Sequence, residues 1–249
     1  MVLDDKAREV YSRQIQMKEI GEEGQQKLAA ASVLVIGCGG LGAPVLYYLT
    51  GMGIGHIGLC DFDVVSPSNL NRQLLFTMDN LGKRKAPTAA SRLLALNPKL
   101  KVTVYDSFFD EQLAASIVPE YDIAVDCLDN FDTRFILNDA CIDASKPFVH
   151  AGIGEFYGQF LTVTPGMGPC LRCLFPGGVK KSDPNKTFGV VGPTPGVLGC
   201  FQALEVLKFL LGLPVCNDGL MTYDGLNLSL EKVSLEASPD CRCRSQILS

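Results

Sequence analysis

A glycine-rich turn in the stretch VLVIGCGGLGAPVLYYL, residues 33–49, constrains the fold more than any other feature of the chain. An apolar, β-branched run precedes the turn and a helix-compatible run follows it, and Gly37, Gly39 and Gly42 satisfy the spacing G-x-G-x-x-G. Glycines let the backbone approach a phosphate closely, and the start of the following helix offers unpaired N–H groups. The stretch therefore predicts a nucleotide-binding unit, with hydride transfer to a nicotinamide cofactor as the default interpretation.

Strand and helix signals alternate from residue 33 to about residue 150. This alternation is typical of an α/β, Rossmann-like fold, in which helices cover both faces of a mostly parallel central sheet. After residue 151 we expect a smaller β-rich part that includes one long buried helix, GVLGCFQALEVLKFLLG. The predicted strands are 33–37, 57–61, 101–105, 122–127, 147–151, one within FYGQFLTVTPG, and two near 220–224 and 227–235; residues 4–17 and 22–30 are predicted to be helical.

A single domain over residues 1–249 is expected, because 47% hydrophobic residues can bury a substantial core without disulfides. Within it we distinguish a helical arm (1–31), a nucleotide-binding part (32–151) and a C-terminal part (152–249). Glycine and proline crowd the start of the C-terminal part, which predicts a mobile loop at 175–192.

The bulk composition excludes several classes of partner. A formal net charge of -5 gives no general attraction to nucleic acid or to anionic membranes. No apolar run approaches the roughly 18 residues of a membrane-spanning helix, and the N-terminus lacks the order of a signal peptide. We therefore expect a cytoplasmic protein. Its ten cysteines are then interpreted as buried residues, metal ligands or reactive thiols, and two histidines do not support a histidine-rich metal site.

Charged residues after the second predicted strand indicate a phosphate-rich ligand. Asp61 follows the glycine turn by about 20 residues, where a carboxylate can accept hydrogen bonds from ribose hydroxyls. The alternative for Asp61 and Asp63 is a solvated turn. Arg72 and the cations at 83–85 come soon afterwards, which is unusual for a dehydrogenase and suits a triphosphate.

The fourth predicted strand ends in two carboxylates, Asp126 and Asp129. Open α/β sheets bind ligands at the carboxyl ends of their strands, and a magnesium ion requires carboxylate oxygen. Asp129 is the better candidate, because Asp126 still belongs to the strand and could orient a neighbouring loop. The alternative for the pair is capping of the following helix.

Several motifs in order carry a resemblance to a known family: YSRQI, the glycine turn, CDFDVVSPSNLNRQ, GKRKA, DCLDN, CLRCLFP and GVVGPTPGVLGCFQALEVLK. They cover nearly the whole chain, which resembles the ThiF/MoeB/HesA adenylyltransferases, relatives of ubiquitin-activating enzymes. The resemblance implies that ATP adenylates the C-terminal Gly-Gly carboxylate of a small ubiquitin-like sulfur carrier protein, releasing pyrophosphate. A separate sulfur donor protein or sulfide would then convert the acyl-adenylate to a thiocarboxylate for sulfur-containing cofactor biosynthesis, such as that of molybdopterin or thiamine.

The resemblance also implies roles for individual residues. Arg13, from YSRQI, would reach into the active site of the neighbouring subunit of a homodimer. Arg72, Lys85 and Asp129 would act on the phosphates, with Mg²⁺ bound by Asp129. Together with the glycine turn, this assigns contacts with ATP to Gly37, Gly39, Gly40, Gly42, Asp61, Asp63, Ser68, Asn69, Arg72, Gln73, Lys85, Asp129 and Asn130.

Two cysteine pairs bear on a metal. Cys170 and Cys173 have the chelating C-x-x-C spacing, and in the family a second such pair near the C-terminus completes a structural zinc site. Here that second pair is Cys241 and Cys243, one residue closer together. We expect these four thiolates to hold Zn²⁺, with free or oxidised tail thiols as the alternative.

A loop cysteine of some family members is replaced in this chain. In those family members the cysteine stands shortly before GVVGP and bonds covalently to the activated carrier. This chain has Asn185 at that position, so no covalent bond to the carrier is expected. Two rival functions remain open: an NAD-dependent oxidoreductase, and a catalytically idle nucleotide-binding scaffold of the same fold. An oxidoreductase would give Arg72, Lys85 and the cysteine pairs no role. An idle scaffold would not need all the charged residues that contact a triphosphate.

Overall fold

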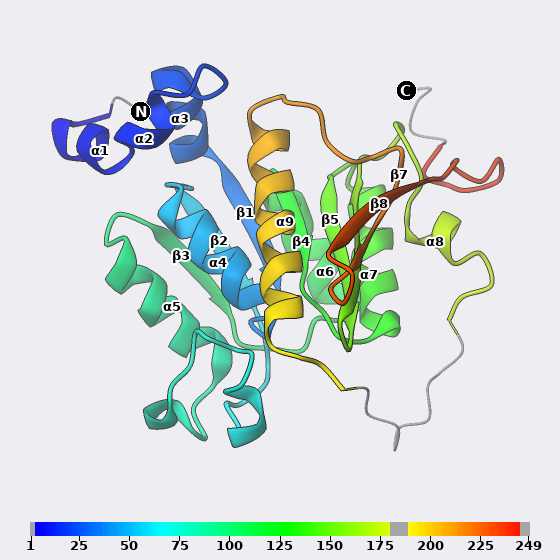
Figure 1. Cartoon of the computed structure of the whole chain (residues 1–249), viewed down its shortest axis with the longest axis horizontal. Coiled ribbons are helices and arrows are strands. Elements are labelled where there is room, and N and C mark those ends of the chain that lie inside the picture. The colour runs from blue at the N-terminus through cyan, green and yellow to red at the C-terminus, as the bar shows by residue number, and fades with distance from the viewer. Residues whose placement is uncertain (1–2, 180–188, 245–249) are drawn as a thin grey trace.

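An eight-stranded sheet organises the computed structural model, which describes residues 3–179 and 189–244 (Figure 1). The strand order is β3-β2-β1-β4-β5-β6-β7-β8. The first five strands in this order, β3-β2-β1-β4-β5, pair in parallel. The remaining pairs, β5-β6, β6-β7 and β7-β8, are antiparallel. The strands are β1 (Ser32–Ile36), β2 (His56–Cys60), β3 (Lys101–Tyr105), β4 (Ile123–Asp126), β5 (Phe148–Gly154), β6 (Tyr157–Val163), β7 (Gly219–Asp224) and β8 (Ser229–Ser234). The predicted α/β fold is confirmed, and the β-rich C-terminal strands continue the same sheet.

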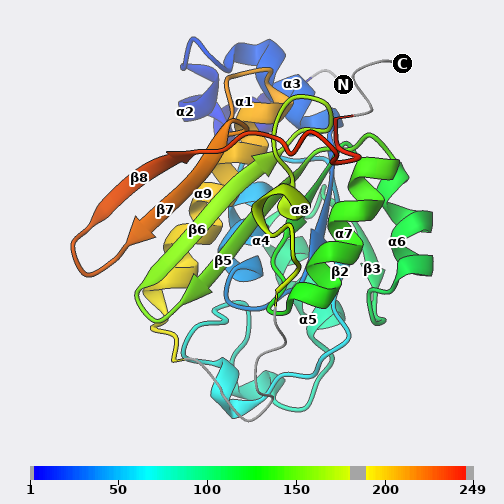
Figure 2. The ribbon, with the colours of Figure 1, turned by 90° about the vertical axis from the view of Figure 1, so that its right-hand side faces the viewer.

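Helices cover both faces of the sheet, as the sequence predicts. One apolar core lies beneath α4 (Gly42–Gly51), α5 (Lys85–Leu96) and α9 (Pro193–Leu210). A second core lies on the opposite face, beneath α6 (Glu111–Ile117) and α7 (Phe131–Asp143), with the short α8 (Leu171–Leu174) beside it (Figure 2). Apolar residues such as Leu34 and Val35 alternate in β1 and are both fully buried, one in each core. This two-sided burial explains the apolar runs of the inner parallel strands β1, β2 and β4.

The long helix α9 begins at Pro193, whereas the sequence placed its start at residue 196. Proline is well tolerated in the first turn of a helix, because the N–H group that it lacks would have no intrahelical partner there. The earlier start brings Pro195 within reach of the glycine turn, since a Cβ on Gly40 would lie 3.2 Å from its side chain.

The N-terminal arm comprises α1 (Asp5–Val10), α2 (Ser12–Ile15) and α3 (Gly21–Ala30). The predicted helix at 4–17 is thus divided, because Tyr11 leaves helical geometry with ψ near 12°. Short 3₁₀ turns, η1 (Pro67–Asn69), η2 (Met78–Asn80) and η3 (Val118–Glu120), complete the elements. Half of the loop predicted at 175–192, residues 180–188, lies outside the described residues. None of the helices described has the length and apolarity needed to cross a bilayer.

Candidate active site

The glycine turn connects β1 to α4 and can close only with glycine at two of its positions. Gly37 has φ of +100°, and a Cβ there would lie 2.5 Å from the carbonyl oxygen of Cys127. A Cβ on Gly42 would lie 2.1 Å from the carbonyl oxygen of Gly37. These contacts exclude side chains from the turn, so the backbone at the start of α4 is open to a phosphate group.

Asp61, directly after β2, is tied to the glycine turn. One carboxylate oxygen accepts a hydrogen bond from the backbone N–H of Cys38 at 2.7 Å, and the other accepts one from Asp63 at 2.9 Å. Burial raises the pKa of Asp61, against the lowering effect of these two hydrogen bonds. Asp61 is therefore fixed against the glycine turn rather than lying in a solvated turn, and its contact with a ribose stays a prediction.

Lys85 is the first residue of α5, and its side chain is only 6% exposed. Its ammonium donates to Asp63 Oδ2 at 2.9 Å, while its backbone N–H donates to the carbonyl of Asp63. A buried ammonium needs such a partner, because desolvation of a lone charge is costly. In this structure Asp63 therefore orients Lys85, a role that sequence spacing alone did not reveal.

Arg72 lies beside the same turn. A Cβ on Gly40 would be 3.5 Å from the Arg72 side chain. The Arg72 guanidinium donates to the carbonyl oxygen of Ser68 at 2.9 Å, so the η1 turn carries this cation next to the glycines. Asn69 caps that turn by accepting from the backbone N–H of Ser66 at 3.1 Å.

Gln73 is buried against the glycine turn, with its amide nitrogen 3.5 Å from where a Cβ on Gly39 would lie. Its Oε1 atom is buried and has no hydrogen-bond partner among the described residues. Buried acceptors rarely stay unpaired, so this oxygen is suited to a ligand that donates a hydrogen bond beside the turn.

The two carboxylates after β4 have different environments, as the sequence predicted. Asp126 is fully buried, and one of its oxygens accepts from the backbone N–H of Leu128 at 3.0 Å. Asp129 is exposed, and its carboxylate lies 3.4 Å from the side-chain amide of Asn130. Capping of α7 falls to Asn130, which accepts from Thr133 at 2.9 Å. The Asp129 oxygens thus remain available to a hard cation such as Mg²⁺.

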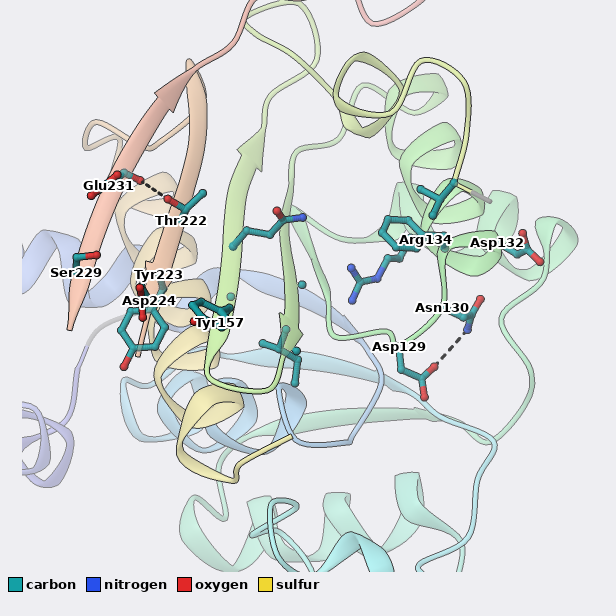
Figure 3. Close-up of a pocket in the computed structure, with 17 residues that line it drawn as sticks. Asp129, Asn130, Asp132, Arg134, Tyr157, Thr222, Tyr223, Asp224, Ser229 and Glu231 are labelled. Carbon is teal, nitrogen blue, oxygen red and sulfur yellow. Dashed lines mark hydrogen bonds between the residues drawn. The ribbon is translucent and has the colours of Figure 1, made fainter. Parts of the chain in front are cut away.

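A pocket of about 1110 Å³ opens at Asp129 (Figure 3). Asp129 and the buried guanidinium of Arg134 lie on one wall, and Asp224 and Tyr223 lie on the opposite wall. Sequence reasoning missed this pocket, because β6, β7 and β8 carry no recognisable motif and reach the site only through sheet pairing. The main polar side chains among its lining residues are Asp129, Asn130, Asp132, Arg134, Tyr157, Gln159, Thr222, Tyr223, Asp224, Ser229 and Glu231.

Arg13 is not brought to this site within its own chain. It is exposed on α2, whose Gln14 donates to the carbonyl oxygen of Met52 at 3.2 Å. Met52 caps the C-terminal end of α4, while the glycine turn lies at the other end. The ten residues of α4 span about 15 Å, which is longer than an arginine side chain.

The four predicted metal ligands form one cluster despite the shortened tail pair. The Sγ atom of Cys170 lies 3.9 Å from that of Cys173 and 3.5 Å from that of Cys241, and the Cys173 and Cys243 sulfurs are 3.6 Å apart. Bonds of about 2.3 Å in a tetrahedral zinc site place sulfurs about 3.8 Å apart. The cluster therefore fits Zn²⁺, and a backbone hydrogen bond of 2.9 Å from Gly166 to Cys243 holds the tail.

The remaining thiols are poor nucleophiles. Cys38, Cys60, Cys127 and Cys141 are buried, and burial raises the pKa of each thiol, to about 12 for Cys60. The half-buried Cys200 and Cys216 also have pKa values raised by burial. A raised pKa leaves less of the reactive thiolate, so we expect these six cysteines to serve packing.

Comparisons with known proteins agree with this geometry. The chain is 44% identical over 239 residues to the mouse (Mus musculus) protein named adenylyltransferase and sulfurtransferase MOCS3, covering 93% of this chain and 51% of that protein. It is 42% identical to the sulfur carrier protein adenylyltransferase of Thermus thermophilus and to the SAMP-activating enzyme E1 of Haloferax volcanii. Each alignment covers 93% of this chain. It covers 88% of the Thermus thermophilus protein and 86% of the Haloferax volcanii protein. The chain thus spans about half the length of the mouse relative and most of the two microbial ones.

Solved structures give the same fold. The E. coli MccB structure with ATP matches with a TM-score of 0.80 and 27% identity, over 96% of this chain and 74% of that one. The microcin C7 biosynthetic enzyme MccB in complex with N-formylated MccA matches with a TM-score of 0.84 and 26% identity, over 94% and 74%. The ThiF family model matches residues 11–245. With almost the whole length matched, the chain belongs to the ThiF family.

Proposed function

We propose that this chain uses ATP to adenylate the C-terminal Gly-Gly carboxylate of a small ubiquitin-like sulfur carrier protein, with release of pyrophosphate. The observation that carries the proposal is the position of Asp129. It lines a large pocket and comes two residues after Cys127, whose carbonyl lies against Gly37 of the glycine turn, and buried and half-buried cations flank that turn. The names of the microbial relatives, a sulfur carrier protein adenylyltransferase and a SAMP-activating E1, support the same activity.

The reaction requires positioning more than proton transfer. The attacking carboxylate is already ionised at neutral pH, so no general base is needed. Its oxygen forms a bond to the α-phosphorus while the bond to the bridging oxygen breaks and pyrophosphate leaves. Arg72 and Lys85 stabilise the negative charge on the phosphates. Asp129 would hold Mg²⁺, which supplies further charge neutralisation when bound.

In this proposal the chain acts as one adenylyltransferase unit. The glycine turn and its neighbours hold ATP, and the carrier tail enters the pocket between α7 and β5 to β8. The cysteine cluster binds one structural Zn²⁺, and Arg13 completes the site of a second copy in a homodimer. A cytoplasmic location stays a prediction from the sequence.

The decisive experiment is exchange of labelled pyrophosphate into ATP with a panel of ubiquitin-like sulfur carriers. We expect exchange with at least one carrier, and no exchange after its terminal Gly-Gly is deleted. Exchange that is independent of every carrier, or reduction of a nicotinamide cofactor instead, would contradict the proposal. The carrier that works also identifies the pathway.

A separate donor should deliver sulfur without an enzyme-linked intermediate. The acyl-adenylate is a mixed anhydride with a good leaving group, so a persulfide or sulfide can attack it directly and release AMP. Asn185 lies outside the described residues, and none of the six cysteines outside the cluster has a lowered pKa. After incubation with carrier and ATP, we expect no thiol-sensitive conjugate by non-reducing electrophoresis and mass spectrometry. A conjugate that maps to any cysteine would show the expectation wrong.

A further inference from the structure

The turn that carries Asp129 is held by a buried charged pair that the proposed chemistry does not use. Asp126 is fully buried at the end of β4, and the Arg134 side chain on α7 is only 6% exposed. The Arg134 Nε atom lies 3.7 Å from Asp126 Oδ2. Burial of two charges is costly, and a hydrophobic pair would often be as stable, so a purpose other than stability is indicated.

Both backbone polar groups of Leu128 are bound by this pair. Its N–H donates to Asp126 Oδ1 at 3.0 Å, and its carbonyl oxygen accepts from Arg134 Nη2. That carbonyl belongs to the peptide group that joins Leu128 to Asp129. Fixing the plane of this peptide limits the directions in which the Asp129 side chain can leave the backbone.

The far side of Asp129 is fixed as well. Asn130 accepts from the backbone N–H of Thr133 at 2.9 Å as the N-cap of α7. Asp129 itself is exposed, and its carboxylate lies 3.4 Å from the Asn130 amide. Its backbone is therefore held on both sides while its carboxylate remains open to the pocket.

Neighbouring elements are adapted to the same pair. His150 on β5 is fully buried and its Nδ1 atom lies 2.6 Å from Asp126 Oδ2, so it anchors the carboxylate from the next strand. A Cβ on Gly152 would lie 3.2 Å from Arg134 Nη1, closer than most real Cβ contacts, so glycine leaves room for the guanidinium. The Gln202 amide on α9 donates to the backbone carbonyl of Asp126 at 2.8 Å.

We propose that Asp126 and Arg134 are positioning residues that aim the Asp129 carboxylate at the metal ion of the bound metal–ATP complex. This inference rests on the proposed role of Asp129 in the adenylation. Groups that orient a metal ligand commonly change metal affinity by about 10- to 100-fold when they are removed.

Arg134→Lys is the sharpest variant. A lysine keeps a positive charge beside Asp126 but lacks the planar guanidinium whose Nη2 atom donates to the Leu128 carbonyl, so the hold on that carbonyl is lost. The probe is Mn²⁺ with ATP, without any carrier, followed by the electron paramagnetic resonance signal of unbound Mn²⁺. We expect the dissociation constant of Mn²⁺ in the ATP complex to rise about tenfold.

A double-mutant cycle separates positioning from general damage. Asp129→Asn alone should weaken Mn²⁺ binding, and adding Arg134→Lys to it should cause no further loss, because both changes act through one carboxylate. Arg92→Gln is the matched control: Arg92 is a half-buried arginine on α5 whose guanidinium donates to Thr77 at 3.3 Å, outside the site. It should leave Mn²⁺ binding unchanged.

Two outcomes overturn the inference: Mn²⁺ binding by folded Arg134→Lys within twofold of the wild type, or an equal further loss in the Asp129→Asn background. If Arg134→Lys does not fold, the double variant Asp126→Asn/Arg134→Gln removes both buried charges and must show the same weakening. The Mn²⁺ experiment uses no carrier, so its result does not depend on whether a carrier is adenylated. If no carrier is adenylated, the proposed function is contradicted while the positioning inference is still tested.

Discussion

Charged residues at this site are held by partners of opposite charge, as the Asp63–Lys85 pair shows. The Lys85 ammonium is buried, so its direction is set by the Asp63 carboxylate that it touches. Asp63 is half exposed, and its assigned contact with ATP stays a prediction. Its contact with Lys85 adds a second expected role, which is to hold the lysine toward the predicted phosphate position.

The first prediction follows from that pairing. Lys85→Met should lower kcat/KM for adenylation about 100-fold or more, since it removes a cation where phosphate charge develops. Asp63→Asn should cost less, about tenfold, and the double variant should be no slower than Lys85→Met alone. The measurement is the rate of pyrophosphate exchange for the two single variants and the double variant. If the losses of the single variants add up fully in the double variant, Asp63 acts independently of Lys85.

The second prediction concerns His150 and pH. Burial lowers the pKa of His150, against the raising effect of Asp126, so the folded protein keeps a neutral imidazole when the unfolded chain takes up a proton. The free energy of unfolding should therefore decrease as pH falls below about 6.5, by up to about 1.4 kcal/mol per pH unit. Asp126, whose pKa is lowered by Arg134 and His150 despite burial, loses its contribution only below about pH 4.

The measurement is urea unfolding between pH 7 and pH 5. His150→Gln should flatten the pH dependence, while His56→Gln should retain most of it, because His56 is only half-buried. Burial also lowers the pKa of His56, so some change is expected there. An unchanged slope in His150→Gln would disprove the assignment.

Among the elements, α7 connects the two predicted metal sites. Its N-terminus follows Asp129, and near its C-terminal end Asp139 binds the Arg172 guanidinium at 2.5 Å. Asp143, one turn further, pairs with Arg242. Each arginine lies between two cysteines of the cluster, so each cysteine pair is docked onto this helix through its own ion pair. Carboxylates are unfavourable at a helix C-terminus, and the arginines offset this.

The third prediction tests the cluster as a metal site. Freshly purified protein should contain about one zinc per chain, and Cys241→Ser should lose it and lower the melting temperature. Adenylation below that temperature should change little, because none of the four cysteines lines the pocket. Cys200→Ser, outside the cluster, provides the control, and zinc-free wild-type protein by metal analysis would refute the site.

At the scale of the whole molecule, the arm and the nucleotide site lie at opposite ends of the sheet. Figure 1 shows α1 to α3 at the end where β1 begins, whereas the glycine turn follows the other end of β1. Arg13 therefore cannot serve its own chain. If it acts on ATP at all, it must do so in a second copy, as the sequence motif suggests.

The fourth prediction is complementation between two inactive variants. Arg13→Ala and Asp129→Ala chains should each be inactive alone, while mixing them should restore part of the activity. One of the two sites in a mixed dimer would then contain an intact set of residues. Activity per mixed dimer, quantified with differently tagged chains, checks this, and no recovery from verified mixed dimers would exclude action in trans.

The local features of this protein were determined by its sequence. The apolar runs of β1, β2 and β4 predict these strands correctly, because a strand buried on both faces must be apolar along most of its length. The glycine turn is equally local, since steric exclusion acts within a few residues, and the different environments of Asp126 and Asp129 follow from where β4 ends.

Contacts between distant segments were decided only by the tertiary structure. Arg134 binds Leu128 and Asp126 because the first turn of α7 folds back over the end of β4, and no residue pattern marks that contact. The pocket wall on β6 to β8 exists because antiparallel pairing extends the sheet past β5. The shortened tail pair reaches Cys170 and Cys173 across about 70 residues, where a count of spacing could not establish the geometry. Sequence spacing determines which side chains within a few residues of each other can meet, whereas the packing of the whole chain decides which remote side chains meet.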